Sequence, residues 1–354
     1  MTKDVVTGVR PGWSRRSVLG GAAAGIGAVA LGMPFVARAQ TSRVRMSLDF
    51  RIYGGNSPFF YGAEKGIFKD LGIDIQLDGA AGSGEAVRRV AGGTHDFGFA
   101  DASTLVEFSA RNPEISPKFT MCIFDRFPAV VLSLKRKPVK TLQEMVGLKI
   151  GTGTSDAGSR ILPALLSLNK IDPKTINFVT VDVKLRDTML LKGEVDAVIA
   201  FDYTAIFNLV EGGVKLEDIT LIYFADNGFN FPGNAILAPR KTIEQDPDLV
   251  RRMTLAITRS WVGANKDRAG CIAAVTKRES LLNAAVERQR LDWVLDKNVM
   301  TENVRKNGLG AVTDARLESG ITLLKEGFGL PQAPTVPSVY DPRFLPDLAE
   351  RRMT

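Results

Sequence analysis

The stretch GAAGSGEAVRRVAGGTHDFGFAD, residues 79–101, decides how the chain folds. It predicts a glycine turn at 82–84, a helix through 85–90, a second turn at 92–93 and a short strand over 96–100. A glycine turn that opens into a helix leaves backbone N–H groups without intrahelical partners, and the helix dipole adds partial positive charge there. Such a turn can hold a polar or anionic part of a small ligand, although one turn alone is more often a simple chain reversal.

The same order of elements occurs twice along the chain. Strand-like apolar runs alternate with helical segments in both halves; they lie at 44–53, 73–77, 96–100 and 119–124 and then at 129–134, 149–152, 176–181, 196–201 and 219–224. Strands that alternate with helices are typical of mainly parallel sheets with flanking helices. The sequence therefore predicts an α/β protein with two similar lobes.

The repeat is visible in residues at one place. Gly93-Thr94-His95-Asp96, an apolar run and Asp101 align with Gly193-Glu194-Val195-Asp196, an apolar run and Asp202. In open parallel sheets, ligands bind beyond the carboxyl ends of the strands. We therefore expect Asp101 and Asp202 at equivalent positions on the two edges of one cleft.

Residues 1–39 have the three zones of an export signal: a twin-arginine pattern at 14–19, an apolar core over 20–36 and the cleavage site Ala37-Arg38-Ala39. This pattern predicts export through the twin-arginine route to the periplasm. These residues contain five Lys/Arg and one Asp, so the net charge falls from +7 to +3 without them. Such a balance argues against a nucleic-acid or anionic-membrane surface.

The remaining 315 residues are enough for about two domains. We predict lobe 1 from 43–128 plus 235–330, lobe 2 from 129–234, and a Pro-rich C-terminal tail over 331–354, lying loosely on the surface. The strands at 129–134 and 234–237 are expected to cross between the lobes as a hinge. Cys122 and Cys271 lie in apolar segments, which favours two buried free thiols.

Three strings together identify a family: AEKGIFKDLGIDIQL, GSGEAVRRVAGGTHDFGFAD and LKGEVDAVIAFD. With the order of elements, they resemble the periplasmic solute-binding proteins of ABC importers in the SsuA/THI5-like (NMT1) group, which serves nitrate, sulfonate, taurine and thiamine-pyrimidine compounds. The resemblance implies a type II periplasmic-binding-protein fold with two crossing hinge strands, closing on a small ligand. It also implies a permease and an ATPase on other chains as partners. We expect a monomer without cofactor or metal.

The resemblance places the ligand contacts in the loops after the strands and at the helix starts. The predicted contacts are Asn56, Ser57, Phe59, Gly82, Ser83, Gly84, Asp101, Thr152, Thr154, Ser155, Asp182, Asp202, Tyr203 and Phe229.

Two kinds of ligand fit these residues. The helix-start loops supply N–H and hydroxyl donors suited to a sulfonate, nitrate or carboxylate. The carboxylates of Asp101, Asp182 and Asp202 instead suit a neutral or cationic heteroaromatic compound, such as an aminopyrimidine, with aromatic side chains for stacking. These aromatic candidates are Phe59, Phe60, Tyr203 and Phe229. We favour the heteroaromatic ligand.

Catalysis has little support in the sequence. His95 is the only histidine, and the chain has no P-loop, paired-cysteine motif or histidine cluster. We therefore expect a binding protein without catalytic residues. A THI5-like pyrimidine synthase and a sensor subunit that presents the same closed form to a receptor are the alternatives.

Overall fold

The computed structural model describes residues 41–153, 156–183 and 185–353. The signal-peptide prediction and the ligand contacts predicted at Thr154 and Ser155 lie outside the described residues.

The first sheet has the strand order β2-β1-β3-β10-β4. Its strands are β1 Ser42–Ser47, β2 Ile73–Asp78, β3 Phe97–Asp101, β4 Lys118–Cys122 and β10 Asn234–Ala238. Strand β1 is parallel to β2 and β3, whereas β10 is antiparallel to both of its neighbours.

The second sheet repeats this arrangement in the order β7-β6-β8-β5-β9. Its strands are β5 Ala129–Leu134, β6 Lys149–Thr152, β7 Asn177–Thr180, β8 Ala197–Phe201 and β9 Ile219–Tyr223. Here β5 is the antiparallel strand, paired with β8 and β9. The two matching sheets confirm the predicted fold class.

The chain passes between the sheets in residues 123–128 and again in 224–233, directly before β5 and β10. The two strands expected to cross are thus the antiparallel strand of each sheet. The crossings bond to each other where β10 begins: Gly233 N–H donates to the Phe124 carbonyl at 2.8 Å, and Ile123 N–H donates to that of Asn234 at 2.8 Å. This pairing ties the movement of one crossing to that of the other.

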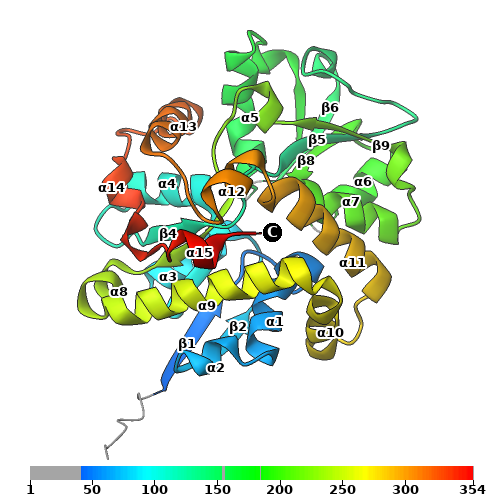
Figure 1. The fold of residues 1–354 in the computed structure, drawn as a ribbon. Helices are drawn as coiled ribbons and strands as arrows, with labels where there is room; N and C mark the ends of the chain where they lie inside the picture. Colours follow the sequence, from blue (N-terminus) through cyan, green and yellow to red (C-terminus); the bar gives the residue numbers. More distant parts are fainter. Residues whose placement is uncertain (1–40, 154–155, 184, 354) are drawn as a thin grey trace, which may run out of the picture. The chain divides into compact units, whose positions relative to one another are not determined.

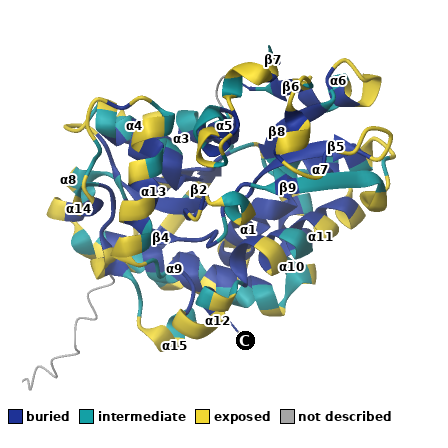
Figure 2. Cartoon of the chain, turned by 90° about the horizontal axis from the view of Figure 1, so that it is seen from above, coloured by how far each residue is buried: buried dark blue, intermediate teal, exposed yellow. Residues whose placement is uncertain are grey.

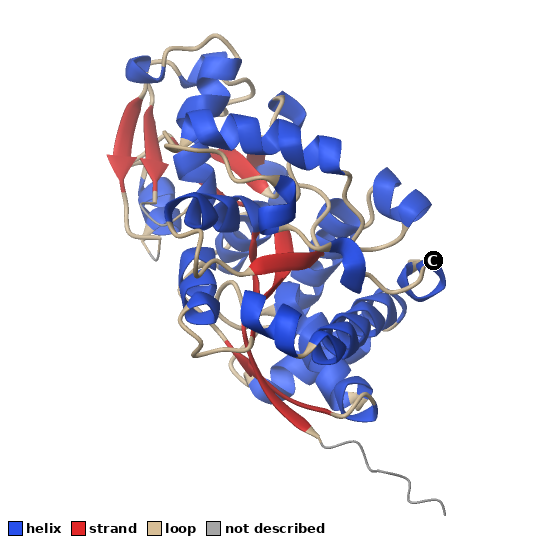
Figure 3. Cartoon of the chain, turned by 90° about the vertical axis from the view of Figure 1, so that its left-hand side faces the viewer, coloured by secondary structure: helices blue, strands red, loops and turns tan. Residues whose placement is uncertain are grey.

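Helices lie around the strands (Figure 3). The first sheet carries α1 Ser57–Glu64, α2 Ile67–Asp70, α3 Ser83–Ala91 and α4 Ala102–Arg111; the second carries α5 Ala157–Leu168, α6 Arg186–Lys192 and α7 Asp202–Glu211. The C-terminal part adds α8 Arg240–Gln245, α9 Pro247–Lys266, α10 Arg268–Arg278, α11 Ala284–Trp293, α12 Glu302–Asn307, α13 Asp314–Gly327, α14 Val336–Val339 and α15 Leu348–Arg351. A π-helix, η6 (Val294–Val299), continues α11.

The helical segment after the first strand is divided in two. Gly66 has φ +77° and separates α1 from α2. The left-handed conformation is readily adopted only by glycine among ordinary residues, so the break is local in origin.

Helices α11 and α13 contact elements of both sheets (Figure 1). Helix α11 packs on α7 and on the 3₁₀ turn η1 (Gly54–Asn56), and α13 packs on α4 and α5. The C-terminal helices therefore connect the two sheets, and the lobe limits given above stay a prediction.

The core follows the apolar faces of the strands. Strands β5 and β8 are almost entirely buried and are dark blue in Figure 2. In the first sheet, Phe59 packs edge-on against Phe99 and Trp261, with ring centroids 5.1 and 5.5 Å apart. Such aromatic packing supplies a large share of the apolar area removed from water.

The C-terminal segment corrects one expectation. Residues 331–354 were expected to lie loosely, but Tyr340 stacks on Phe119 at 4.7 Å and Asp341 N–H donates to the Phe119 carbonyl at 3.0 Å. Val339 and Phe344 are buried as well, so their apolar side chains hold the segment in place. Cys122 and Cys271 are buried and unpaired, as predicted.

Candidate functional site

The loop after β1 reaches the cleft earlier than the sequence indicated. Strand β1 ends at Ser47, whereas we expected it to run to Tyr53. Leu48 N–H donates to the Asp78 carbonyl at 2.8 Å, and the chain then leaves the sheet. Asp49 and Phe50 therefore lie beyond the carboxyl end of a parallel strand, where open α/β sheets bind ligands.

An inner pocket of about 70 Å³ lies between loops of the two sheets. Its lining includes Asp49, Phe50, Gly82 and Ser83 from the first-sheet side and Asp156, Arg186, Phe201 and Tyr203 from the second-sheet side. A compound bound here touches both halves of the molecule.

Asp49 offers an unused hydrogen-bond acceptor to this pocket. Its side chain is 3 % exposed; Oδ2 accepts from the Tyr203 hydroxyl at 3.0 Å and from Asn234 Nδ2 at 2.7 Å. Oδ1 has no partner among the described residues. The pKa of Asp49 is raised to about 6, mainly by burial; the hydrogen bonds from Tyr203 and Asn234 lower it, and the charge of Asp101 adds a smaller increase. A ligand N–H or O–H donor at Oδ1 would satisfy this oxygen.

Asp101 supplies a second buried carboxylate near the pocket. Its backbone N–H donates to Ser83 Oγ at 3.1 Å, which fixes Ser83 at the start of α3. Oδ1 accepts from Thr104 N–H at 2.9 Å and from the Ser103 hydroxyl, so this side chain caps α4. Oδ2 is buried without a partner in the described structure. Burial raises the pKa of Asp101 to about 6.

The opposite wall carries one carboxylate and one guanidinium. Asp156 caps α5: its oxygens accept from Gly158 N–H at 3.1 Å and from the Ser159 hydroxyl at 2.9 Å. Burial raises the pKa of Asp156, and the positive charge of Arg186 partly offsets this. Among the described residues of the pocket wall, two carboxylates, Asp49 and Asp156, face one arginine, so this part of the wall is poorly matched to an anion.

Two half-buried aromatic rings face the pocket from different sheets. Phe50 comes from the loop after β1, and Phe201 ends β8. Phe201 packs edge-on against Phe127 at 6.0 Å, while Phe50 lies 6.3 Å from Tyr53. No ring contact joins Phe50 to Phe201 in the described part of the chain. A planar compound between them can stack on both.

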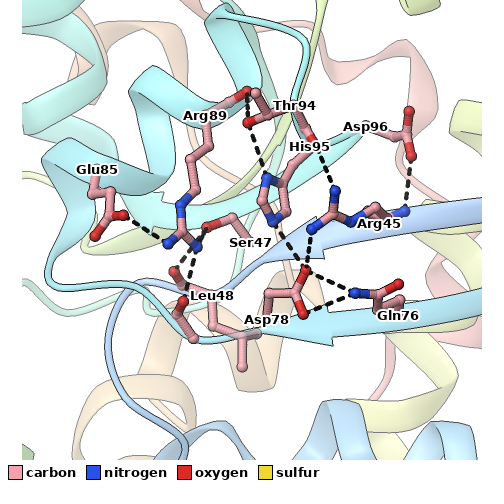
Figure 4. A network of polar contacts seen from close by, with 11 residues as sticks. Arg45, Ser47, Leu48, Gln76, Asp78, Glu85, Arg89, Thr94, His95 and Asp96 are labelled. Atoms are coloured by element: carbon pink, nitrogen blue, oxygen red, sulfur yellow. Dashed lines mark hydrogen bonds and ion pairs between the residues drawn. The ribbon is translucent and has the colours of Figure 1, made fainter.

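A larger outer chamber of about 780 Å³ adjoins the inner pocket, with which it shares Phe50, Ala81 and Val183. The loop between β2 and α3 forms one wall. Helix α3 holds this loop: Arg89 donates to the Gly79 carbonyl at 2.8 Å, and Ala81 N–H donates to Glu85 at 2.7 Å. Glu85 and Arg89 also pair with each other at 2.6 Å (Figure 4).

His95 belongs to the supporting network behind this loop (Figure 4). Its Nε2 lies 3.1 Å from Asp78, which also accepts from Arg45 at 3.0 Å. Burial lowers the pKa of His95. The only histidine of the chain therefore has a structural environment away from the pocket lining.

Four predicted contacts are found in the cleft: Gly82, Ser83 and Tyr203 line the inner pocket, and Asp182 lines the outer chamber. Gly84 and Thr152 are next to these loops but are not part of either lining. Asp101 stands directly behind Ser83.

Other predicted contacts have different roles. Asn56 accepts from Tyr53 N–H at 3.1 Å and Ser57 donates to the Gly54 carbonyl at 2.6 Å, so both stabilise the turn before α1. Phe59 lies in the core described above. Phe229 packs on Phe127 at 4.7 Å. This corrects our expectation for both rings: they are buried and line neither the inner pocket nor the outer chamber described above.

Asp202 is also buried, but its acceptor positions are filled. It receives hydrogen bonds from Tyr203 N–H (2.6 Å) and Asn298 (3.0 Å) on Oδ1 and from Trp293 (2.9 Å) and Tyr223 (3.0 Å) on Oδ2. Asp202 therefore does not take the equivalent position at the cleft edge that the repeat predicted; it joins α7 to the C-terminal helices.

Sequence reasoning missed Asp49, Phe50, Asp156, Arg186 and Phe201. The rule about carboxyl ends of strands would have found Asp49 had the end of β1 been placed correctly. The end of β8 was predicted at Phe201, as observed, but the contact was assigned to Asp202 and Tyr203 after it. Asp156 has a sequence signal as a helix cap before Ala157. Arg186 has none, because a buried arginine depends on partners that only the fold supplies.

No group of three or more His, Cys, Asp or Glu within the described ranges is arranged to hold a metal ion.

Comparison with known proteins identifies a family and a relative. Residues 55–268 match the NMT1/THI5-like family. A riboflavin-binding protein, RibY, of Chloroflexus aurantiacus is 24% identical over 297 residues, which is 82% of each chain.

Solved structures show the fold. The periplasmic aliphatic sulphonate-binding protein SsuA of Escherichia coli superposes with a TM-score of 0.68 at 15% identity, covering 86% of this chain and 94% of that one. The alkanesulfonate-binding protein SsuA of Xanthomonas axonopodis pv. citri, bound to MOPS, gives 0.64 at 14% identity, with coverage of 86% and 100%.

Proposed function

Because the chain belongs to the NMT1/THI5-like family, we propose that it is a periplasmic solute-binding protein that captures a planar nitrogenous heteroaromatic compound in its cleft. It would deliver this compound to the permease and ATPase of an ABC importer. Export through the twin-arginine route, suggested by residues 14–19, is part of the proposal.

The observation that carries the proposal is Asp49, which lines the inner pocket together with Phe50 and Phe201 and whose buried Oδ1 has no partner in the described structure. A ring N–H satisfies the oxygen while its faces stack on the two phenyl rings. An isoalloxazine has both features, and an aminopyrimidine offers its exocyclic amino group as the donor instead. The relative named as riboflavin-binding makes riboflavin the first compound to test.

An anionic ligand is the second candidate. The start of α3 at Ser83 offers N–H groups of the kind that bind sulfonates, and the structures similar in fold include sulfonate-binding proteins. Against it, an anion would have to enter a pocket lined by the carboxylates of Asp49 and Asp156. The cost of burying like charges together favours the heteroaromatic ligand.

Capture requires that the ligand stabilise one arrangement of the two sheets. Tyr203, at the start of α7, already donates to Asp49 after β1, so the two sides of the pocket are linked by a hydrogen bond. A ligand between Phe50 and Phe201 adds contacts to both sides and shifts the population toward the closed form. The closed form would then dock on the permease.

The proposal assigns no catalytic step. Cys122, the buried thiol of β4, has a strongly raised pKa because of its burial, which makes it a poor nucleophile. Conversion of a bound compound by the purified protein would support the pyrimidine-synthase alternative. Uptake that persists after deletion of the gene would support the sensor alternative.

A thermal-shift and calorimetry panel tests the proposal. Riboflavin and an aminopyrimidine are compared with taurine, ethanesulfonate, nitrate and a small carboxylate. We expect a ring compound to raise the melting temperature and to bind with 1:1 stoichiometry. Stabilisation by a sulfonate or nitrate, with no response to the ring compounds, would contradict the proposal.

A further inference from the structure

The inner pocket is small compared with a heteroaromatic ligand. An engineered cavity of about 150 Å³ accommodates benzene, whereas the inner pocket measures about 70 Å³. The adjoining outer chamber is about 780 Å³. A compound held by Asp49 therefore inserts one edge into the inner pocket and extends the rest of its structure into the chamber.

A chain of hydrogen bonds links the two spaces. Arg186, in the wall of the inner pocket, donates through Nε to Asp187 Oδ1 at 2.9 Å. Asn208 Nδ2 donates to Asp187 Oδ2 at 2.8 Å, and Arg51 donates to Asn208 Oδ1 at 2.7 Å. Arg51 follows β1, whereas Asn208 belongs to α7, so the last bond joins the two sides of the cleft.

The chamber wall is polar and its charges are nearly balanced. Arg51 and Arg89 stand against Glu85, Asp182 and Asp187. Arg89 is paired with Glu85, and Asp187 accepts from both Arg186 and Asn208. Among the described residues, Arg51, Arg89 and Arg186 balance Glu85, Asp182 and Asp187. Such a surface suits uncharged groups that both donate and accept hydrogen bonds, and a phosphate would add a charge to it.

We propose that the outer chamber is a second subsite that binds an uncharged, polyhydroxylated chain attached to the ring. This inference rests on the proposed function and specifies its substrate class. The hydroxyl groups meet Arg51 from one side of the cleft and Asn208 from the other. Their hydrogen bonds therefore add to closure as well as to affinity.

Three probes test the subsite, because they share the dimethylated tricyclic skeleton of the flavins and differ in the chain; lumichrome is the alloxazine form, with a hydrogen on N1 and none of the chain at N10. Lumichrome has no hydroxylated chain, riboflavin has a ribityl chain, and riboflavin 5′-phosphate adds a charge at its end. We expect riboflavin to bind about tenfold more tightly than lumichrome, as one or two net hydrogen bonds would give, and about tenfold more tightly than the phosphate.

The outcomes separate the two proposals. Equal affinity for lumichrome and riboflavin would overturn the second subsite and leave the proposed function standing. Tighter binding of riboflavin 5′-phosphate than of riboflavin would contradict the proposal that the bound chain is uncharged. Failure of every flavin and pyrimidine to bind would overturn both proposals.

Substitutions in the outer chamber test whether the preference for riboflavin over lumichrome arises there. Asn208→Ala should reduce the preference for riboflavin over lumichrome from about tenfold to about threefold or less. Arg43→Ala is the control, since Arg43 lies on β1 with a 94 % exposed side chain and is absent from both linings. A preference that persists in Asn208→Ala and also in Arg51→Ala would contradict the assignment.

Discussion

Asp49 and Asp202 invite comparison, because both are buried aspartates at the carboxyl end of a strand region and both have a raised pKa caused mainly by burial. They differ in their partners. Asp202 accepts four hydrogen bonds, spread over both oxygens. Asp49 accepts two side-chain bonds on one oxygen and leaves Oδ1 without a partner in the described structure.

The difference separates a structural aspartate from a binding one. Burial and pKa direction are the same for both and therefore do not assign a role. The donors around Asp202 come from α7, β9, α11 and η6, so its carboxylate joins elements that are distant in sequence. Asp49 lines the inner pocket, and we propose that its unpartnered oxygen gains a partner from a ligand.

The largest expected effect is on stability. Asp202→Ala should lower the free energy of unfolding by about 3–5 kcal/mol, because it leaves several buried donors without an acceptor. Asp49→Ala should cost clearly less, since only Tyr203 and Asn234 lose a partner. Urea denaturation of both variants measures this difference. Equal losses would remove the distinction between the two sites.

The next largest effect is on ligand affinity. Here we expect a larger loss from a change at Asp49 than from a change at Asp202. Asp49→Asn should weaken riboflavin binding by about 2 kcal/mol, or roughly thirtyfold, because a charged acceptor is replaced by an amide. Asp202→Asn, assayed at a temperature where it is folded, should bind nearly as tightly as the unaltered protein. Calorimetric titration tests both variants. A larger loss in Asp202→Asn would reverse our assignment.

A pH titration sharpens the comparison. The pKa of Asp49 is raised to about 6 in the free protein, and a ligand N–H donor favours its ionised form. Affinity should therefore rise about tenfold between pH 5 and pH 7 and level off above the pKa. The side chains facing Asp49 are Tyr203, Asn234 and the neighbouring Asp101. A profile unchanged by Asp49→Asn would assign the titration to Asp101.

The smallest predicted effect concerns stacking. Phe201→Ala should weaken binding of a ring compound by about 1 kcal/mol, since one aromatic face is lost. Phe178→Ala is the matched control, because Phe178 lies on strand β7 with 40 % of its surface exposed. An equal response of the two variants, measured by fluorescence titration, would show that Phe201 does not touch the ring.

The fold was predictable because local patterns encode it. The alternation of strands and helices and the repeated Gly/Asp pattern gave two sheets of the same design, as the strand orders confirm. The turn at Gly82 and Ser83 was found for the same reason: glycine turns and helix starts have sequence signals.

The rest of the site depends on tertiary contacts. Val44, Met46, Leu48, Phe50 and Ile52 alternate with polar residues, so the two-residue period continues past Ser47, where strand pairing stops. Alternation of apolar and polar residues indicates that one face of the segment is buried. It does not show where the strand stops pairing with its neighbour. Phe59 and Phe50 likewise both follow the first strand, and only packing reveals that Trp261 covers Phe59.

Mass spectrometry of the compound that co-purifies with the protein tests the central claim most directly. The account predicts a nitrogen-containing aromatic compound, bound 1:1 and lost from Asp49→Asn but retained by the control Arg43→Ala. A sulfonate, nitrate or other anion, retained equally by both variants, would contradict it.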